Sequence, residues 1–538
     1  MQTQRTTFRR IPLMRQHSIQ PSIFMRSSWG RLTLAALLAL GPNSCSPAAQ
    51  PWHVVLISLD TTRADHLSCI SGPEGPARTP AIDQLASEGA LFLQAQTSAV
   101  TTLSAHSSLM TGTWPHRHGV VRNGFDLAPE NQTLAETLGA FGYRTRAVLG
   151  SFALESRFGF DQGFEVFDES FDLLVGAEGA DQNQRLADRV TGAALTHVRE
   201  HDASEPLFLF THYFDAHAPY DPPPAMRKAW ASRIGNTVGD PLTVERAVKA
   251  GQALVLGSGV RTPGLAGTVR GGLSKALVTE HHSQPAALDT QLAALYAAEV
   301  EALDGALERL FVGLQEAGLW DQTIVVLTAD HGETFTEHAD RWNHGLWVHD
   351  TTTRVPLMIR LPATHPKAQQ SRGQKISTVV SNVDVYPTVL GLLGIEAGPE
   401  VQGVDLGPLL FGEQLQRGAV FSEATQPWMG LEDAARKKGR WANSLKPHSV
   451  RKGRWKYIRA PYLELEQLFD MEADPGEQVN LLLDPAMAKV LGDMRNELIG
   501  YYRLADPFPS SFNRSQIEET RARLEAMGYG GGEEEPPR

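Results

Sequence analysis

Three continuous hydrophobic runs in the chain each end at polar residues. The runs cover residues 53–59, 206–210 and 323–328, and they lead into Asp60, residues 211–217, and Asp330 with His331. A hydrophobic run without polar alternation is typical of a strand buried on both faces of a parallel sheet. Ligands of open α/β sheets bind beyond the carboxyl ends of the strands, so we expect a functional site there.

Amphipathic segments lie between these runs. Residues 290–317 carry apolar side chains at helical spacing and end at Gly318, and Thr79 followed by Pro80 predicts a helix with Thr79 as its N-cap. Alternating strands and helices predict an α/β fold with a mostly parallel central sheet flanked by helices.

The composition of the chain changes along its length, and this predicts its organisation. Residues 225–288 are rich in Gly, Ser, Thr and Ala, which indicates an insertion or long loop within a main domain at 51–415. Beyond residue 415 short strand-like pieces and turns predict a smaller α+β C-terminal subdomain at 416–513. We expect a helix and a disordered tail in residues 514–538 and an N-terminal segment in residues 1–50.

The N-terminal segment has the features of an export signal. Residues 32–41 form a short apolar run, preceded by Arg26 and Arg31 and followed by Ala48 and Ala49. We therefore predict an exported protein, periplasmic or extracellular. The sequence allows two outcomes, cleavage of the signal near Ala48 or Ala49 and lipid attachment at Cys45. Only lipid attachment would anchor the protein to a membrane. A disordered segment or a core helix is the alternative to an export signal.

Composition and charge exclude several classes of protein. The 538 residues are 42% hydrophobic and 20% charged, as in ordinary globular proteins, and the net charge of −12 argues against nucleic acid as a partner. The two cysteines, Cys45 and Cys69, are too few for a disulfide framework or a Cys-rich zinc protein. We expect Cys69 to be a packed, unreactive thiol.

Asp60, Asp330 and His331 are candidate metal ligands. They follow two strands that a parallel sheet would bring together. Two carboxylates and an imidazole at one sheet edge predict a site for a divalent cation.

Several segments resemble the sulfatase family, within the alkaline-phosphatase superfamily. The matching residues run from about 53 to 482 in the expected order, and they are residues 55–67, 212–220, 328–333, 343–345, 354–357 and 468–480. The resemblance identifies residues 51–415 as a catalytic domain with an alkaline-phosphatase-like fold.

One segment differs from the pattern of this family. Sulfatases carry Cys (or Ser)-x-Pro-x-Arg ahead of a helix that is similar to Ser108-Leu-Met-Thr-Gly112, and the cysteine becomes formylglycine, the nucleophile. In this chain the three slots hold Thr102, Ser104 and His106. No formylglycine is therefore expected.

The resemblance also implies a ligand set for one divalent cation. Its members are Asp60, Thr102, Asp330 and His331. We expect Ca²⁺, with Mg²⁺, Mn²⁺ and Zn²⁺ as alternatives. A second ion would need a further set of the type Asp-x-x-x-His plus a distant histidine, and the candidates are His212, Asp215, His217 and His344. Asp215 has no histidine four residues further on, so we expect one ion.

The same resemblance suggests catalytic roles. Thr102 would attack as a nucleophile at the start of a helix over residues 103–110, and the alternative role is a plain N-cap. His217 and His344 would serve as general acid or as ligands of the substrate anion. Arg63 would bind an oxyanion, or it would only pair with Asp65.

Together these features predict a hydrolase that cleaves sulfate esters of small molecules or glycans. A threonyl ester lacks the second hydroxyl by which formylglycine hydrate expels its sulfate, so a phosphate or phosphonate esterase of the same superfamily is the alternative. A catalytically inactive binding protein is the second alternative, and the retained ligand residues argue against it.

Overall fold

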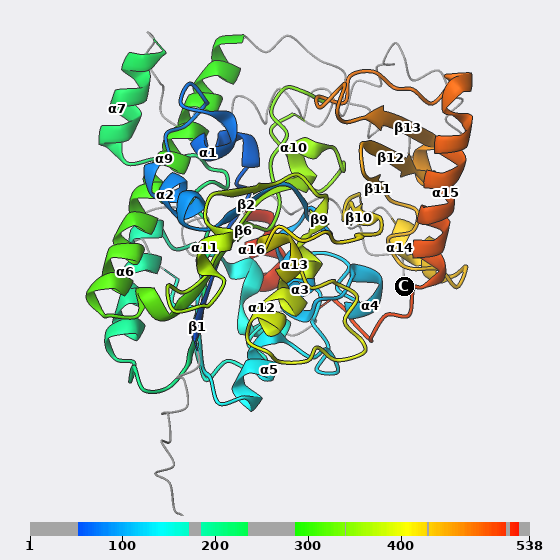
Figure 1. The fold of residues 1–538 in the computed structure, drawn as a ribbon. Helices are drawn as coiled ribbons and strands as arrows, with labels where there is room; N and C mark the ends of the chain where they lie inside the picture. Colours follow the sequence, from blue (N-terminus) through cyan, green and yellow to red (C-terminus); the bar gives the residue numbers. More distant parts are fainter. Residues whose placement is uncertain are drawn as a thin grey trace, which may run out of the picture. The chain divides into compact units, whose positions relative to one another are not determined.

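The computed structural model of the protein describes residues 52–171, 184–234, 286–338, 341–427, 430–512 and 517–526 (Figure 1). The predicted signal segment at 1–50, residues 235–285 of the predicted insertion and the tail beyond residue 526 lie outside the described residues. Among the described helices, none combines the length and the apolar composition that a membrane span requires.

The three hydrophobic runs form three neighbouring parallel strands. Strand β1 (His53–Leu59) lies between β5 (Leu207–Tyr213) and β6 (Thr323–Ala329), and every residue of the three strands is buried. A strand enclosed on both faces has no solvent-facing positions, which explains the absence of polar alternation in the sequence.

The described residues place these strands in a nine-stranded, mostly parallel sheet, which confirms the predicted fold class. Its order is β4-β3-β5-β1-β6-β7-β2-β8, with β9 also paired to β2. Strand β7 is antiparallel to both of its neighbours, and the other pairs are parallel. The remaining strands are β2 (Ala90–Gln96), β3 (Arg144–Val148), β4 (Val166–Asp168), β7 (Arg354–Arg360), β8 (Gln374–Ile376) and β9 (Val380–Ser381).

Helices cover both faces of this sheet (Figure 1). One group packs around the predicted long helix and comprises α9 (Ala286–Glu316), α2 (Pro80–Glu88), α6 (Ala187–Arg199) and α7 (Pro224–Arg233). The second group lies on the opposite side and comprises α3 (Thr102–Thr111), α4 (Pro115–His118), α5 (Leu134–Ala140), α12 (Val385–Leu392) and α13 (Gly407–Leu410). Three short helices complete this part, namely α1 (Ser68–Ser71), α10 (Asp350–Thr353) and α11 (Ala368–Ser371).

Thr79 is the N-cap residue of α2 and Pro80 is its first helical residue, as predicted, but the cap is not made by the threonine side chain. Thr79 makes no capping hydrogen bond with its side chain. The carboxylate of Asp304, on α9, accepts the backbone N–H groups of Ala81 and Ile82 at 3.1 and 2.9 Å. A carboxylate from another helix thus satisfies the free amides and complements the helix dipole, which a local sequence pattern cannot reveal.

A second, antiparallel sheet lies in the C-terminal part of the chain. It consists of β10 (Val420–Glu423), β11 (His448–Lys452), β12 (Trp455–Ala460) and β13 (Leu465–Asp470), and α15 (Ala488–Arg503) packs against it. The other helices of this part are α14 (Leu431–Arg436) and α16 (Ile517–Ala526), the latter within the segment at 514–538 in which a helix is predicted.

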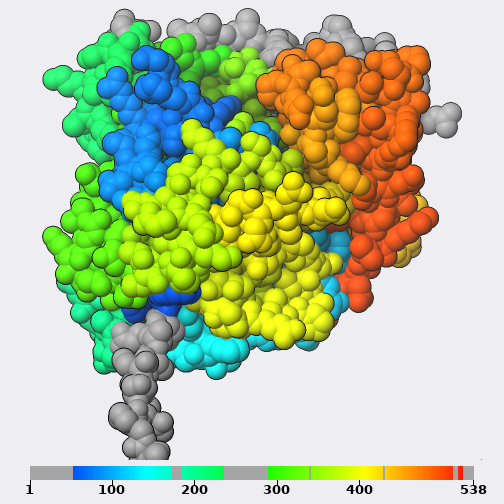
Figure 2. Space-filling view, viewed as in Figure 1, coloured from blue at the N-terminus to red at the C-terminus, as the bar shows by residue number. Residues whose placement is uncertain are grey.

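The C-terminal sheet supports the segment that enters α3. The backbone N–H of Glu423 donates to the carbonyl oxygen of Ser98 at 2.9 Å, and the N–H of Val100 donates to the carbonyl oxygen of Glu423 at 3.3 Å. In Figure 2 the orange and red C-terminal residues form a continuous surface with the yellow residues near 400. The C-terminal sheet therefore helps to hold the residues that lead into Thr102.

Candidate active site

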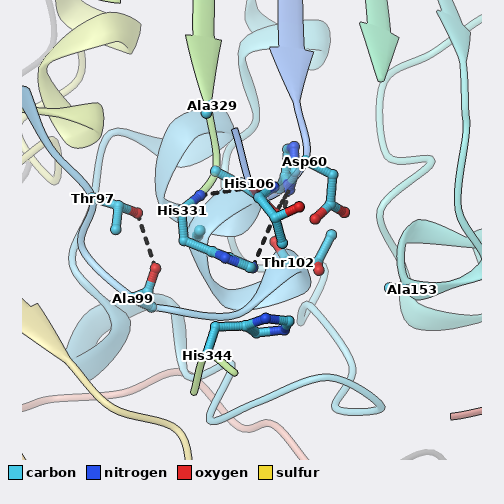
Figure 3. A network of polar contacts seen from close by, with 12 residues as sticks. Asp60, Thr97, Ala99, Thr102, His106, Ala153, Ala329, His331 and His344 are labelled. Carbon is cyan, nitrogen blue, oxygen red and sulfur yellow. Dashed lines mark hydrogen bonds and ion pairs between the residues drawn. The ribbon is translucent and has the colours of Figure 1, made fainter. Parts of the chain in front are cut away.

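The register of the central strands brings the predicted metal ligands together. Leu59 of β1 pairs with Ala329 of β6, so Asp60 and Asp330 follow at neighbouring strand ends. Figure 3 shows the side chains of Asp60, Thr102, His106, His331 and His344 gathered beyond these ends.

Asp60, Asp330 and His331 form a buried cluster. One possible ligand atom from each lies within 4.8 Å of the other two. The carboxylate oxygen Oδ1 of Asp330 accepts the backbone N–H groups of Thr61 at 3.1 Å and of His331 at 2.7 Å. The other oxygen, Oδ2, is buried and makes no hydrogen bond with the described residues, and the same is true of His331 Nε2.

The charges in this cluster are strongly coupled. Burial and the neighbouring Asp330 carboxylate raise the pKa of Asp60 well above its usual range. Burial alone would raise the pKa of Asp330 too, but the imidazoles of His331, His106 and His212 hold it below its ordinary value. Burial works against protonation of His331, yet Asp330 and Asp60 raise its pKa.

These residues fit a divalent cation. Two buried carboxylates that repel each other are costly unless a positive charge lies between them. Buried polar atoms without hydrogen bonds are rare in native proteins, and four of those among the described residues belong to Asp60, Asp330 and His331. Carboxylate oxygens and an imidazole nitrogen are donors for such an ion.

Thr102 is the first residue of α3 and is fully buried. Its hydroxyl interacts with the Asp60 carboxylate, which favours the ionised form of that group. The following amide, that of Leu103, donates to Asn123 Oδ1 at 2.8 Å. The threonine predicted as nucleophile therefore lies beside one predicted metal ligand, at the positive end of a ten-residue helix.

His106 occupies the slot of the family's arginine and has both ring nitrogens engaged. Its Nδ1 lies 2.7 Å from the carbonyl oxygen of Thr102, and its Nε2 lies 2.8 Å from the Ser58 hydroxyl. A carbonyl only accepts, so Nδ1 carries the proton and Nε2 accepts from Ser58. Burial, together with the nearby His212, lowers the pKa of His106 to about 3.

His344 lies in a loop, with Asn343 before it and Gly345 after it, and its side chain reaches the cluster. A bridge between Thr334 and Asn343 folds this loop back, and the ring of His344 lies 4.4 Å from that of His331. Its Nδ1 lies 3.4 Å from both carboxylate oxygens of Glu333. The Tyr220 hydroxyl is 3.5 Å from the same carboxylate, so Glu333 is oriented between an imidazole and a phenol.

His217 also reaches this region, but as a neutral imidazole. Its Nδ1 donates to the carbonyl oxygen of Ala218 at 2.6 Å, and its ring lies 5.2 Å from that of His344. Burial, followed by the proximity of His344, lowers the pKa of His217 to about 3. At neutral pH the proton of the ring is on Nδ1, so Nε2 is a hydrogen-bond acceptor and not a proton donor.

The guanidinium of Arg63 is paired with two carboxylates. It pairs with Asp65 and with Glu337, both at 2.7 Å, and donates to the carbonyl oxygen of Glu333 at 3.1 Å. It also lies 4.5 Å from the centre of the Phe335 ring. The contact with Asp65 is the ion pair predicted as the alternative to oxyanion binding, and Glu337 adds a second pair. The contact with the Glu333 carbonyl helps to fix the segment that carries Glu333.

Two residues of the site, Glu333 and Asn123, are not among the predicted ligand and catalytic residues, and a third, His212, is considered from the sequence only as a candidate ligand of a second ion. Glu333 lies within a segment that resembles the sulfatase family. Because it follows Asp330 and His331 so closely, the sequence gives no sign that it has a role of its own. His212 belongs to the buried end of β5, and its Nε2 lies 3.3 Å from Asp60 Oδ2. Asn123 lies in a loop, and its contact with Leu103 has no local sequence signal.

Cys69 is partly buried and packs against the hydrophobic core. Burial, reinforced by Asp83, raises the pKa of its thiol to about 12. The thiol is therefore protonated at neutral pH, and the cysteine is free.

Family models match most of the described chain. The sulfatase family model matches residues 53–395, more than half of the sequence, and this range includes every candidate site residue. A model described as the C-terminal part of N-sulphoglucosamine sulphohydrolase matches residues 337–503.

Individual hydrolases show the same similarity. The chain is 26% identical over 529 residues to the multifunctional alkaline phosphatase superfamily protein PehA of Trinickia caryophylli, covering 84% of this chain and 95% of that protein. It is 27% identical over 458 residues to the choline-sulfatase of Rhizobium meliloti, covering 77% and 80% respectively. The crystal structure of the phosphonate monoester hydrolase of Agrobacterium radiobacter matches with a TM-score of 0.62 and 23% identity, over 84% of this chain and 95% of that one.

Proposed function

Because this chain belongs to the sulfatase family and is therefore an ester hydrolase of the alkaline phosphatase superfamily, we propose that it cleaves sulfate esters with Thr102 as nucleophile. One observation carries the proposal. Thr102 is the first residue of α3 and lies beside Asp60, within the cluster that also contains Asp330 and His331.

The proposed ligands of a divalent cation are Asp60, Thr102, Asp330 and His331. When bound, such an ion offsets negative charge on the ligands and on the oxygens of the substrate. The expected identity from the family resemblance is Ca²⁺, with Mg²⁺, Mn²⁺ and Zn²⁺ as alternatives.

In the proposed reaction the Thr102 hydroxyl gives up its proton to solvent water, and its Oγ attacks the sulfur of the ester. The bond between sulfur and the leaving oxygen breaks, and the leaving alcohol takes a proton. Water then attacks the sulfur of the threonyl sulfate and releases sulfate and free Thr102. The side-chain amide of Asn123, whose Nδ2 is buried without a hydrogen bond to the described residues, is a candidate donor to an oxygen of the substrate.

His344 is the stronger candidate for the general acid. The carboxylate of Glu333 faces its Nδ1, so the ion pair stabilises the imidazolium and leaves Nε2–H to be donated. His217 is neutral, and in this arrangement its Nε2 accepts a hydrogen bond from the substrate or from His344. Arg63 serves to position the Glu333 segment.

Phosphate or phosphonate monoesters are the second candidate substrate class. Thr102 has a single hydroxyl, so its ester has to be hydrolysed by direct attack of water. This is familiar chemistry for phosphoryl enzymes, and it favours a phosphorus centre over a sulfur centre. We also propose that the chain is exported, on the strength of residues 32–41.

The test is an assay of the purified full chain against an aryl sulfate, an aryl phosphate, an aryl phosphonate monoester and a bis-aryl phosphate. Each substrate is tested after chelation and reloading with each of the four cations. Thr102→Ala should lower kcat by about 10³-fold or more, whereas Thr102→Ser should keep measurable activity. Thr101→Ala is the matched control, because the adjacent threonine makes no capping hydrogen bond with its side chain.

Each result of this assay has a clear meaning. Full activity of Thr102→Ala would show that the nucleophile is misassigned. Hydrolysis of phosphorus esters alone would replace the sulfate proposal by its alternative. No hydrolysis of any ester with any cation would contradict the proposed function.

A further inference from the structure

A cavity of about 820 Å³ lies in the C-terminal part of the chain, and none of the described residues that line it belongs to the candidate active site. Its wall combines α14, β12, the last turn of α15 and the segment after α15 with Gly119 and Val121. In Figure 1, α14 and α15 lie side by side at the right. Pockets for small molecules measure about 300 to 1,000 Å³, so this cavity has room for a ligand of several rings.

The described residues that line this cavity include four arginines and no aspartate or glutamate. Arg436 is the last residue of α14, Arg503 is the last residue of α15, Arg459 lies on β12, and Arg440 follows α14. A chain with a net charge of −12 thus gathers positive charge around one hollow. Guanidinium groups bind the oxygens of anions with paired N–H donors, so this wall suits a ligand with several anionic groups.

The protein itself neutralises these guanidinium groups only weakly. Arg440 and Arg503 are exposed and form no ion pair with the described residues. Arg436 lies 3.6 Å from Asp433, and both side chains of this pair are exposed. Exposed ion pairs of this kind contribute little, so Arg436 also keeps its capacity to bind an anion.

The carboxylates nearest to the fourth arginine and to the segment after α15 are shared with arginines outside the wall. Arg459 lies 3.7 Å from Glu466, and the same carboxylate also pairs with Arg495. Asp506 lies between two lining residues in the sequence, but its carboxylate pairs with Arg117 at 3.1 Å. The positive charge of the cavity wall is therefore not offset from these positions.

The wall also has apolar parts. Ile499, Tyr502 and Phe508 line the cavity, together with Pro507 and Pro509. A small inorganic anion would leave these side chains and most of the volume without contacts. A sulfated sugar chain offers sulfate oxygens to the guanidinium groups and C–H faces to the apolar side chains, and burial of the latter favours binding.

We propose that this cavity is a second, non-catalytic site, which binds a sulfated oligosaccharide through Arg440 and Arg503. The choice of a sulfated ligand rests on the sulfate ester substrates of the proposed function, whereas the anion site rests on the arginines and the cavity alone. A sugar chain with several sulfate groups is held at this site while another of its groups is cleaved elsewhere. The net negative charge of the chain disfavours long nucleic acids as the occupant.

Isothermal titration calorimetry of the full chain tests this binding, with maltotetraose that is sulfated on its hydroxyl groups as the probe. All titrations use the Thr102→Ala background, so that hydrolysis adds no heat. Arg440→Gln combined with Arg503→Gln should weaken binding by about 100-fold, because each guanidinium contributes a charge-assisted hydrogen bond worth roughly a factor of ten. Lys437→Gln combined with Lys438→Gln is the matched control, since these two cations precede Arg440 but do not line the cavity. The control should change Kd by less than about 3-fold.

Hydrogen exchange locates the bound probe. We expect the sulfated tetrasaccharide to slow exchange in residues 436–444 and 499–510, and this protection should disappear in the double arginine variant. Unsulfated maltotetraose, inorganic sulfate and a thymidine tetranucleotide are the comparison ligands, and each should bind more weakly than the sulfated sugar. Urea denaturation verifies that the variants are folded, as expected for exposed arginines.

The outcomes separate this inference from the catalytic proposal. Arginine-dependent binding in a protein that hydrolyses no ester would support the inference and contradict the proposed function. Equal loss of affinity in the arginine and lysine variants would overturn the inference, since it would show general attraction to the surface. Equally tight binding of inorganic sulfate, of the unsulfated sugar or of the tetranucleotide would overturn it too, as would protection confined to other segments.

Discussion

The imidazole of His106 donates from Nδ1 to the backbone carbonyl oxygen of Thr102, one turn earlier in α3, at 2.7 Å. On its other side the same ring accepts a hydrogen bond from Ser58 on β1. The ring thereby ties the first turn of α3 to the strand that ends at Asp60. Thr102 and Asp60 lie next to each other because this link, together with the Asn123 contact, fixes the helix start.

Replacement of His106 should therefore damage both stability and catalysis. His106→Ala leaves the Ser58 hydroxyl buried and opens a cavity between Phe160 and Phe210, so we expect a loss of about 2 to 4 kcal/mol in the free energy of unfolding. Urea denaturation measures the loss, and kcat should fall as well. Ser58→Ala removes one hydrogen bond only and should cost about 1 kcal/mol. Equal stability of His106→Ala and the wild type would show that the link is not structural.

Thr102→Cys should not yield a formylglycine enzyme. The modifying enzyme of sulfatases recognises Pro and Arg after the cysteine, and here Ser104 and His106 occupy those slots. We expect mass spectrometry to find an unmodified thiol after co-expression with a formylglycine-generating enzyme. A peptide with the complete Cys-x-Pro-x-Arg motif, expressed in the same cells, is the positive control. Detection of an aldehyde at residue 102 would mean that the flanking residues do not protect the site.

Glu333 should act through His344. In Glu333→Gln the imidazolium of His344 loses its carboxylate partner, so the acid form should be lost at lower pH. We expect kcat to fall by about 10- to 100-fold, the alkaline limb of its pH profile to move to lower pH, and KM to change little. Glu337→Gln is the matched control, since Glu337 pairs with Arg63 rather than with a histidine of the site. The same pH shift in both variants would argue against a specific role of Glu333.

The sequence alone predicts the centre of this fold well, for a physical reason. Strands enclosed on both faces must be hydrophobic throughout, so β1 and β6 are visible as uninterrupted runs, and α9 follows its periodicity at 286–316 against the predicted 290–317. Because β1 and β6 are parallel neighbours, the residues that follow them, Asp60 and Asp330, lie at the same edge of the sheet. This proximity can therefore be predicted from the sequence pattern.

The rest of the site depends on contacts between distant segments. Glu333 meets His344 only because the bridge from Thr334 to Asn343 folds the loop back. Asn123 reaches the first turn of α3 across 20 residues, and Glu337 reaches Arg63 across 274. His212 is the last but one residue of a buried strand. Its proximity to Asp60 arises only because β5 lies beside β1.

Asp215 gives the protein a pH-dependent stability that can be measured apart from catalysis. Its Oδ1 accepts the backbone N–H of Ala187 at 2.8 Å, while its Oδ2 is buried without a hydrogen bond to the described residues. Burial raises the pKa of this carboxyl to about 7 from the usual 3.8. The neutral form is thus favoured in the folded protein, whereas the unfolded chain ionises near pH 4.

Because the pKa is raised on folding, the contribution of Asp215 is fully present below about pH 4 and is lost as the pH rises to about 7. Asp215→Asn keeps an acceptor for Ala187 and cannot ionise. Its stability relative to the wild type should therefore rise between pH 4 and pH 7 and level off above, with a total gain of up to about 4 kcal/mol. Urea unfolding at pH 5 and pH 8 measures the difference, and Asp188→Asn, a largely exposed carboxylate on α6, should change stability by less than about 0.5 kcal/mol at both. A pH-independent effect of Asp215→Asn would mean that Asp215 is ionised in the folded protein throughout this range.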